Sequence, residues 1–442
     1  MIEFDTLPAG WTIAKFEDLL NYIQPTNYIV KSTDYKDTYP TPVLTAGKSF
    51  IKGYTNETNG IFTKLPTIIF DDFTTATQFV NFPFKVKSSA MKILQPTCDL
   101  VNIKLAYYFM QTVHLKGETH KRFWISEYSQ IPVPLAPLNE QKRIIDKIEQ
   151  LLTDLDKGIE YLETTKQQLK VYRESVLKWA FEGKFTKSKM QFEKIGTHAN
   201  LITKGASPKW QGFNYTNDSS QLLFVTSENV RENYIDVTEP KYLNLGFNQI
   251  QKRSILQKDD VLFNLVGASI GRAAIYNLDR IANINQAVAI IRLKHTLSNK
   301  YLSYYLNAEV AKQKYLGKVV DVARANLSLT DVSNLEIPVP LVSSEQIKII
   351  QEIESRLSVC DKIEETIESS LQQAEALRLS IIKKAFEGKL VPQDPNDEPA
   401  EKLLERIIAL RKAQGKQGKA KPEKKGKVKA EKKPKRKEKI EI

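Results

Sequence analysis

Two stretches of the chain end in nearly the same residues: WAFEGKF at Trp179–Phe185 and KAFEGKL at Lys384–Leu390. The similarity extends far upstream of this phrase. When the chain is shifted by 205 residues, Glu140–Lys184 and Glu345–Lys389 are identical at 21 of 45 positions. Composition alone gives roughly one match in fifteen. The chain therefore contains a duplication, and any prediction of its fold must begin there.

Both copies have the apolar periodicity of one long helix. Apolar residues recur at spacings of three and four, which is the coiled-coil pattern. In the first copy they are Ile148, Leu152, Leu155, Ile159, Leu162, Leu169, Tyr172, Val176 and Trp179, with one interruption at Lys166. In the second copy they are Ile353, Leu357, Cys360, Ile363, Ile367, Leu371, Ala374, Leu377 and Ile381.

Start signals precede both predicted helices. The segment IPVP occurs twice, at 131–134 and 337–340. Proline is excluded from helix interiors, and Asn139 and Ser343 follow these segments as expected N-cap residues.

Stop signals end both helices, because Gly183 and Gly388 stand where a left-handed C-cap is expected. An alternative is that the Glu-Gly-Lys tripeptides at 182–184 and 387–389 belong to a metal-dependent nuclease site. Such a site needs a further acid on an adjoining strand, whereas here the tripeptide ends a helix.

The connection between the copies predicts their relative direction. Eight or nine residues follow the first helix before the next globular segment begins near Phe192, and they reach at most about 30 Å. A helix of about 43 residues is roughly 65 Å long. We therefore expect an antiparallel pair, in which the end of the first helix lies beside the start of the second.

The remaining sequence forms two globular blocks with mixed strand and helix patterns. The expected strands are 67–73, 91–94, 222–226, 261–266, 273–276 and 287–293. Each block then has one late helix, from Asn102 and from Asn299, with a Leu-x-Tyr-Tyr pattern in common, which suggests that the blocks are distant copies. We interpret Tyr107, Tyr108, Tyr304 and Tyr305 as helix core and not as base-stacking residues.

The expected fold class is α+β: two mixed α/β domains and two long antiparallel coiled-coil helices, with approximate two-fold symmetry. The expected divisions are a first domain (1–138), a first long helix (139–184), a second domain (185–342), a second long helix (343–389), a C-terminal segment with a short helix (390–413) and a basic disordered tail (414–442).

The net charge of +13 is concentrated in the tail, because residues 416–439 hold 13 Lys/Arg and three Glu, and only +3 remains for the body. A tail that lacks apolar residues to bury should be disordered, and it can bind phosphates non-specifically or only aid solubility. Cys98 and Cys360 cannot form a disulfide framework. Without an apolar spanning segment or a leader pattern, we expect a cytoplasmic protein.

Sequence patterns of catalytic and cofactor sites are missing. No phosphate-binding loop occurs, and Val266–Arg272, with two glycines, is better explained by a turn between strands. Asn81–Phe84 has one proline where the amino-methyltransferase signature has two. Asp71 and Asp72 could suggest a metal site, but acidic residues at a strand end are the simpler interpretation. The histidines form no ligand pattern: His114, His120, His198 and His295.

The order domain, long helix, domain, long helix resembles the specificity subunit of type I restriction–modification enzymes. The resemblance depends on PLNEQKRIIDKIE (Pro137–Glu149), SEQIKIIQEIE (Ser344–Glu354), the two FEGK stops and LVPQDPNDEPAEKLLERI (Leu390–Ile407). It covers residues 1–413 and leaves the basic tail unassigned.

This resemblance implies a chain without catalysis of its own. The globular blocks would be target recognition domains that each read one half of a split, asymmetric double-stranded DNA site, while the helices set the spacer and dock two methyltransferase subunits. Those subunits would bring S-adenosylmethionine, and restriction/translocase subunits would bring ATP and Mg²⁺. A methylation-only complex is one alternative; a structural coiled-coil scaffold and a nuclease are others.

Basic residues in loop-like stretches are the candidates for DNA contact, because Arg and Lys are the usual partners of bases and phosphates. A solvated surface charge is the alternative for each. The candidates are Lys48, Lys64, Lys121 and Arg122 in the first domain, and Lys204, Arg231, Arg253, Arg272 and Arg324 in the second.

Overall fold

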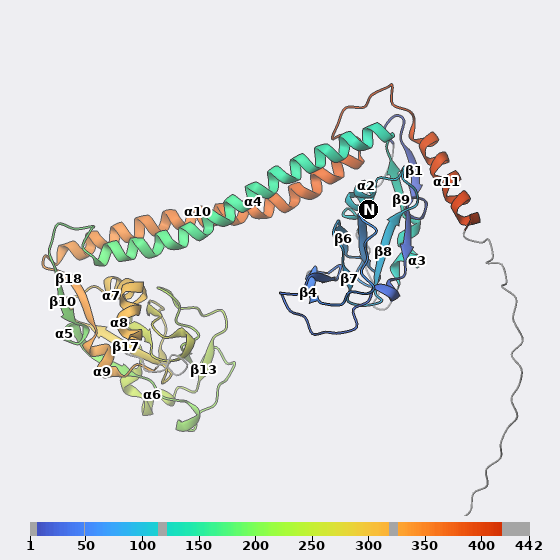
Figure 1. Cartoon of the computed structure of the whole chain (residues 1–442). Coiled ribbons are helices and arrows are strands. Elements are labelled where there is room, and N and C mark those ends of the chain that lie inside the picture. The colour runs from blue at the N-terminus through green and yellow to red at the C-terminus, as the bar shows by residue number, and fades with distance from the viewer. Residues whose placement is uncertain (1–6, 48, 114–121, 318–325, 418–442) are drawn as a thin grey trace, which may run out of the picture. The chain divides into compact units, whose positions relative to one another are not determined.

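The computed structural model describes four stretches of the chain: residues 7–47, 49–113, 122–317 and 326–417. The chain divides into two compact units: unit 1 comprises residues 1–158 and 372–442, and unit 2 comprises residues 159–371. The division cuts both long helices, α4 (Leu138–Phe181) and α10 (Ser344–Phe386), so each unit holds one globular domain and a part of each helix (Figure 1).

The described residues of the unit 1 domain form nine short strands. In chain order they are β1 (Thr12–Lys15), β2 (Leu20–Ile23), β3 (Thr41–Leu44), β4 (Ile51–Thr55), β5 (Thr67–Asp71), β6 (Thr77–Val80), β7 (Lys85–Val86), β8 (Met91–Pro96) and β9 (Pro132–Leu135). The sheets have the orders β2-β8-β5-β6, β4-β3-β7 and β1-β9. The helical segments are α1 (Phe16–Leu19), η1 (Pro25–Tyr28), α2 (Ile103–Met110), α3 (Phe123–Ser126) and η2 (Tyr128–Gln130).

The domain of unit 2 repeats this plan. Its strands are β10 (Met190–Lys194), β11 (Ala199–Lys204), β12 (Leu222–Val225), β13 (Lys241–Leu243), β14 (Val261–Asn264), β15 (Ala273–Ile275), β16 (Ala282–Ile284), β17 (Val288–Leu293) and β18 (Glu336–Pro340). Its helical segments are α5 (Ile195–His198), η3 (Lys209–Gln211), α6 (Phe247–Ile250), η4 (Lys252–Ser254), η5 (Gly267–Ser269), α7 (Asn299–Asn307), α8 (Glu309–Leu316) and α9 (Leu329–Asn334).

The strand topologies of the two domains correspond element by element. The four-stranded sheet β11-β17-β14-β15 matches β2-β8-β5-β6, and β13-β12-β16 matches β4-β3-β7 with the same parallel and antiparallel partners. The repeated IPVP segment supplies the last strand in both, where β9 pairs with β1 and β18 with β10. The suggestion that the two blocks are distant copies is therefore confirmed by topology.

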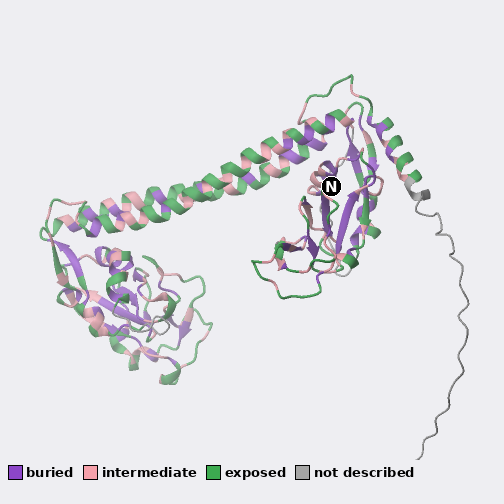
Figure 2. Cartoon of the chain, in the orientation of Figure 1, coloured by how far each residue is buried: buried purple, intermediate pink, exposed green. Residues whose placement is uncertain are grey.

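Each domain shares its core with the ends of the long helices. In unit 1, Ile144 and Ile148 of α4 and Phe386 of α10 are buried together, and Phe386 lies with its ring 4.9 Å from that of Phe109. In unit 2, the end of α4 supplies Phe181, whose ring lies 5.1 Å from that of Tyr305. Buried residues gather in the domains and at the helix ends, whereas the long helices are otherwise largely exposed or half-buried (Figure 2).

The two long helices run antiparallel, as predicted. In unit 2, Lys166 pairs with Glu368 at 2.8 Å, and Arg173 pairs with Asp361 at 2.7 Å. Seven residues forward on α4 thus correspond to seven residues backward on α10. In unit 1 the start of α4 and the end of α10 share one core, and further along the pair Asp156 contacts Arg378.

The predicted apolar seam needs one correction. Tyr172, Trp179, Ile363 and Leu377 are 37–50% exposed and lie outside it. The spacing of four and three continues instead through Lys166, Arg173 and Ala180 on α4, and through Glu364 and Arg378 on α10. The charged members are tolerated because they pair across the helices, as Arg173 does with Glu364 at 3.0 Å. Apolar periodicity alone could not distinguish these positions from their neighbours.

The repeated FEGK phrase is a helix stop, as predicted. Gly183 and Gly388 have φ of 79° and 69°, a conformation that glycine adopts without strain. The N–H of the following lysine donates to the carbonyl five residues earlier, from Lys184 to Trp179 and from Lys389 to Lys384, each at 2.9 Å. These bonds satisfy carbonyls that a helix end would leave free.

The helix starts agree with the prediction in one case and not in the other. Ser343 directly precedes α10, at the N-cap position, but α4 already begins at Leu138. Asn139 therefore lies inside the helix, and its amide donates to Asp397 at 3.2 Å. The side chain of Asn139, which the sequence assigned to an N-cap, therefore binds Asp397, a residue far away in the chain.

The last described helix, α11 (Ala400–Gln417), belongs to the core of unit 1. Ala400, Leu403 and Ile407 are spaced three and four residues apart and are fully buried there. The N–H of Ala400 donates to the carbonyl of Gly10 at 2.8 Å. The helix extends four residues into the stretch predicted as tail, and residues 418–442 lie outside the described residues.

Candidate nucleic-acid interface

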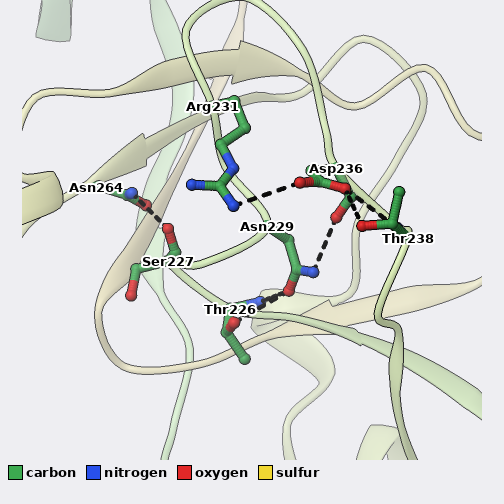
Figure 3. Close-up of polar contacts among 7 residues, drawn as sticks. All are labelled: Thr226, Ser227, Asn229, Arg231, Asp236, Thr238 and Asn264. Atoms are coloured by element: carbon green, nitrogen blue, oxygen red, sulfur yellow. Dashed lines mark hydrogen bonds and ion pairs between the residues drawn. The ribbon is translucent and has the colours of Figure 1, made fainter. Parts of the chain in front are cut away.

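The loop after β12 in unit 2 is organised by one buried side chain. The Oδ1 of Asn229 accepts hydrogen bonds from the N–H and the hydroxyl of Thr226 at 2.8 and 3.0 Å, and its amide donates to the carbonyl of Asp236 at 2.9 Å (Figure 3). The N–H of Asp236 returns a bond to the carbonyl of Asn229 at 2.8 Å. Residues 226–236 are therefore a preorganised loop.

Arg231 is the basic residue that this loop presents. Its guanidinium donates to Oδ2 of Asp236 at 3.3 Å, and its side chain remains 39% exposed. The hydroxyl and the N–H of Thr238, followed by Arg231, lower the pKa of Asp236. Since one carboxylate contact uses only part of the five donors of a guanidinium, donors of Arg231 remain for another partner.

A second loop lies against the first through Asn264, the last residue of β14. Its amide donates to the carbonyl of Ser227 at 2.9 Å (Figure 3), and its N–H donates to the carbonyl of Arg272 at 2.9 Å. A side chain at Gly271 would meet the ring of Tyr315, so this close turn requires glycine. Val266–Arg272 is the turn between two strands, as predicted, and Arg231 and Arg272 stand on neighbouring loops.

The other described candidates of unit 2 lie on its surface. Lys204 is the exposed last residue of β11, and Arg253 is exposed in η4. Arg324 lies outside the described residues.

In unit 1, Lys64 and Arg122 are exposed. Hydrogen bonds with buried side chains hold the backbone of both segments in place. The amide of buried Gln95 donates to the carbonyl of Lys64 at 3.1 Å. Arg122 directly precedes α3, whose Trp124 N–H donates to the buried carboxylate of Asp72 at 2.8 Å. Lys48 and Lys121 lie outside the described residues.

Some basic residues are unavailable to any ligand. Lys85 and Lys92 are almost fully buried, and they pair with Glu57 at 3.1 Å and with Asp72 at 3.4 Å. In unit 2, Arg292 pairs with buried Asp260 at 2.8 Å. These ion pairs stabilise the domains, and the two lysine pairs also remove their cations from the surface.

The acidic pair considered as a metal site has a structural role. Asp71 accepts the N–H groups of Phe73 and Thr74 in a turn, whereas Asp72 faces Lys92. Among the residues that the structure describes, no group of three or more His, Cys, Asp or Glu side chains could hold a metal ion.

Several residues of the interface escape sequence reasoning. Asn229, Asp236 and Asn264 are uncharged or acidic, and a search for basic loop residues passes over them. Only the fold shows that these three side chains position Arg231 and join the two loops.

Comparison with known families and proteins agrees with this architecture. The family model described as "Type I restriction modification DNA specificity domain" matches residues 8–170 and 208–373, once in each half. The chain is 31% identical over 410 residues to the EcoR124I/EcoR124II type I restriction enzyme specificity subunit of Escherichia coli, with 87% of this chain and 93% of that protein covered. It is 30% identical over 310 residues to the EcoBI specificity subunit, with 64% and 65% covered.

Solved structures show the same fold. A chain from a study of complex assembly and conformational transition of the type I R-M system has a TM-score of 0.63 at 16% identity, with 87% of this chain and 99% of that chain covered. The HsdS subunit from Thermoanaerobacter tengcongensis has a TM-score of 0.52 at 16% identity, with 87% and 98% covered.

The match in both halves bears out the architecture of two recognition domains with long helices. Specificity subunits of type I systems act in complexes with DNA and the other subunits of the system. No described helix is both long and apolar enough to cross a membrane. The chain belongs to the type I restriction–modification DNA specificity family, as a non-catalytic DNA-recognition subunit with two target recognition domains.

Proposed function

We propose that the two domains each read one half of a bipartite, asymmetric duplex DNA site. The observation that carries this proposal is that the two domains share one strand topology but present different side chains in their loops. In the connection between β13 and β14, unit 2 presents exposed Arg253. In the corresponding connection between β4 and β5, unit 1 presents exposed Lys64, whose carbonyl accepts a hydrogen bond from Gln95. Different side chains at the same place in a fold select different bases.

In this proposal the long helices set the gap between the half-sites and dock two methyltransferase subunits. Large apolar side chains exposed on these helices support the docking role, because their burial against a partner would stabilise a complex. On α4, Tyr161 and Val171 are 73% and 62% exposed; on α10, Val359 is 58% exposed.

Catalysis belongs to the partners in this proposal. The methyltransferase subunits bring S-adenosylmethionine, and restriction/translocase subunits bring ATP and Mg²⁺. A DNA target places the complex in the cytoplasm.

The basic candidates of the loops contact bases or phosphates: Lys48, Lys64, Lys121, Arg122, Lys204, Arg231, Arg253, Arg272 and Arg324.

The nuclease alternative has little support in the helix ends. Glu182 and Lys184 pair with each other at 2.8 Å, as Glu387 and Lys389 do at 2.9 Å, and each pair closes a helix. A complex that only methylates remains the second candidate, and the neighbouring genes would decide between it and a restriction system.

Methylome sequencing of the host tests the proposal directly. The expected result is a modified motif of two different short half-sites with a fixed gap, which disappears when the gene for this chain is deleted and returns with a plasmid copy. A continuous or palindromic motif that depends on this chain would contradict the assignment of one half-site to each domain.

A further inference from the structure

Trp210 is the most exposed large apolar side chain among the described residues, with 84% of its surface open to solvent. It lies in η3, on the segment between β11 and β12 of unit 2. Exposed apolar residues are common, but a tryptophan is the largest side chain, and burying it against a partner yields more free energy than burying any other. Its position therefore needs an explanation.

The turn that carries Trp210 is well defined. The carbonyl of Pro208 accepts the N–H groups of Gln211 and Phe213, each at 2.9 Å, and Gly212 closes the turn with φ +80°. Before the turn, Gly205 lies so close to β16 that a side chain would meet the carbonyl of Ile284. The backbone that carries the exposed indole is therefore fixed by hydrogen bonds within the turn.

The surroundings of the turn are basic. Lys204 precedes it in sequence, Lys209 lies within it next to Trp210, and both are exposed. After the turn, the ring of Phe213 packs edge-on against that of Phe247 at 5.4 Å, and this contact joins the turn to α6, which leads into exposed Lys252 and Arg253.

These cations are also free of acidic partners. Within the described part of the chain, no carboxylate pairs with Lys204, Lys209, Lys252 or Arg253, in contrast to Lys241, which Glu228 holds at 2.6 Å. An exposed apolar side chain on a segment that also carries unpaired cations suits a surface that is both negatively charged and able to accept a flat ring. Duplex DNA offers this combination in its phosphates and base edges.

We propose that Trp210 is a recognition residue of unit 2: its indole packs against a base pair of the half-site, while the flanking cations contact the adjacent phosphates. This inference rests on the proposed reading of one half-site by unit 2. Apolar side chains read the thymine methyl in the major groove or wedge between base steps, and either contact adds discrimination that Arg231 alone does not give.

The test uses the full-length chain, a duplex with the motif found by methylome sequencing and a duplex with that motif scrambled. Fluorescence anisotropy compares wild type with Trp210→Ala and Trp210→Phe. The matched control is Phe192→Ala, which removes another exposed aromatic side chain of the same domain, on β10. Thermal unfolding of each variant is measured in parallel.

We expect Trp210→Ala to weaken binding to the specific duplex about tenfold, in line with the loss of one aromatic–base contact. Trp210→Phe should retain most of the affinity, and Phe192→Ala should match wild type. Addition of the specific duplex should also quench a tryptophan emission that is missing in Trp210→Phe. Unfolding temperatures should be unchanged, because an exposed indole contributes little to the core.

The outcomes separate the two levels of the proposal. If wild type prefers the specific duplex but Trp210→Ala binds it equally well, the inference is wrong and the proposed function stands. If Trp210→Ala binds DNA normally but fails to assemble with the methyltransferase subunits, Trp210 contacts protein and the inference is again wrong. A wild-type chain that does not distinguish the duplexes even with the methyltransferase subunits present overturns both.

Discussion

At the scale of residues, whether a charge is paired and buried decides what it can do. Lys85 and Lys92 are basic but serve as buried ion-pair partners, whereas Arg231 is held by one carboxylate and stays accessible. Since both kinds count equally in the net charge, only the partners of each residue separate a structural cation from a candidate DNA contact.

Replacing Arg231 by alanine should weaken binding to the specific duplex about tenfold and relax the preference at one position of the half-site read by unit 2. Bidentate arginine contacts to a base account for discrimination of this size. Methylome sequencing or binding to single-substitution duplexes measures the preference. The matched control is Lys300→Ala, which removes an exposed cation paired with Glu354. A loss of affinity that is uniform across all positions would identify a phosphate contact instead.

The carboxylate of Asp397 fixes the C-terminal segment of unit 1. The guanidinium of Arg143 at 2.7 Å, followed by the amide of Asn139, lowers the pKa of Asp397. A pKa lowered in the folded state stabilises the fold above the ordinary aspartate value, about 3.9, and this contribution is lost as pH falls through the folded value.

Asp397→Asn should therefore lower the thermal midpoint near neutral pH, by about 2–4 °C, and the difference from wild type should shrink under acid conditions below the folded pKa. Glu401→Gln, at an exposed position of α11, is the control and should match wild type. An Asp397→Asn deficit that is independent of pH would show that the ion pair is not its cause.

At the scale of elements, the long helices form a heptad seam in which several positions are charged. Lys166 and Arg173 are one heptad apart, and their partners Glu368 and Asp361 are one heptad apart in the opposite direction. Apolar contacts between these pairs come from a cluster of Leu169, Cys360 and Ile367. The charged pairs fix which residues face each other, since a shift in register would separate them.

Four residues inserted at Thr164-Thr165 should change the permitted gap between the half-sites and leave both half-sites unaltered. One helical turn adds about 6 Å of length, which corresponds to about two base pairs of duplex at roughly 3.4 Å per base pair. Methylome sequencing of a strain with the variant reads the gap directly. An unchanged gap would show that the helices do not set the spacing.

The exposed apolar face of the helices gives a separate prediction. Tyr161→Asp together with Val171→Asp should abolish co-purification of the methyltransferase subunits and leave the fold intact, because both side chains point into solvent and a buried charge is costly at an interface. Circular dichroism checks the fold. The same aspartates at exposed polar positions, Lys170 and Glu174, should have no effect. Normal co-purification of the apolar-face variant would place the docking surface elsewhere.

At the scale of the whole molecule, the charge distribution predicts a division of labour. The chain has a net charge of +13, of which +10 lies in residues 416–439. Of the remaining basic residues, Lys85 and Lys92 are buried in ion pairs. Phosphate neutralisation supplies much of the affinity for DNA. The isolated chain should therefore bind its site weakly, and addition of the methyltransferase subunits should raise the affinity at least tenfold.

Gel-shift titrations with and without the methyltransferase subunits measure this difference. A chain truncated after residue 417 serves as the control, because it removes the basic tail and separates its contribution from that of the partner. Equal affinities with and without the partner would contradict the division of labour.

The sequence by itself determined the duplication, the two long helices with their direction, and the helix stops at Gly183 and Gly388. Each of these depends on local periodicity, backbone preference or linker length, which are properties of neighbouring residues. The IPVP repeat was recognised only as a signal that precedes each helix. That it forms the strands β9 and β18, paired with β1 and β10, is visible only in the fold.

Only the tertiary structure decided which residues face each other. It placed Arg173 and Glu364 in the helix seam and Tyr172 outside it. It also brought Asn264 to the loop of Arg231, across 37 residues of sequence from its partner Ser227. Such contacts join residues far apart in the chain, and their free energy depends on burial and geometry that no local pattern encodes.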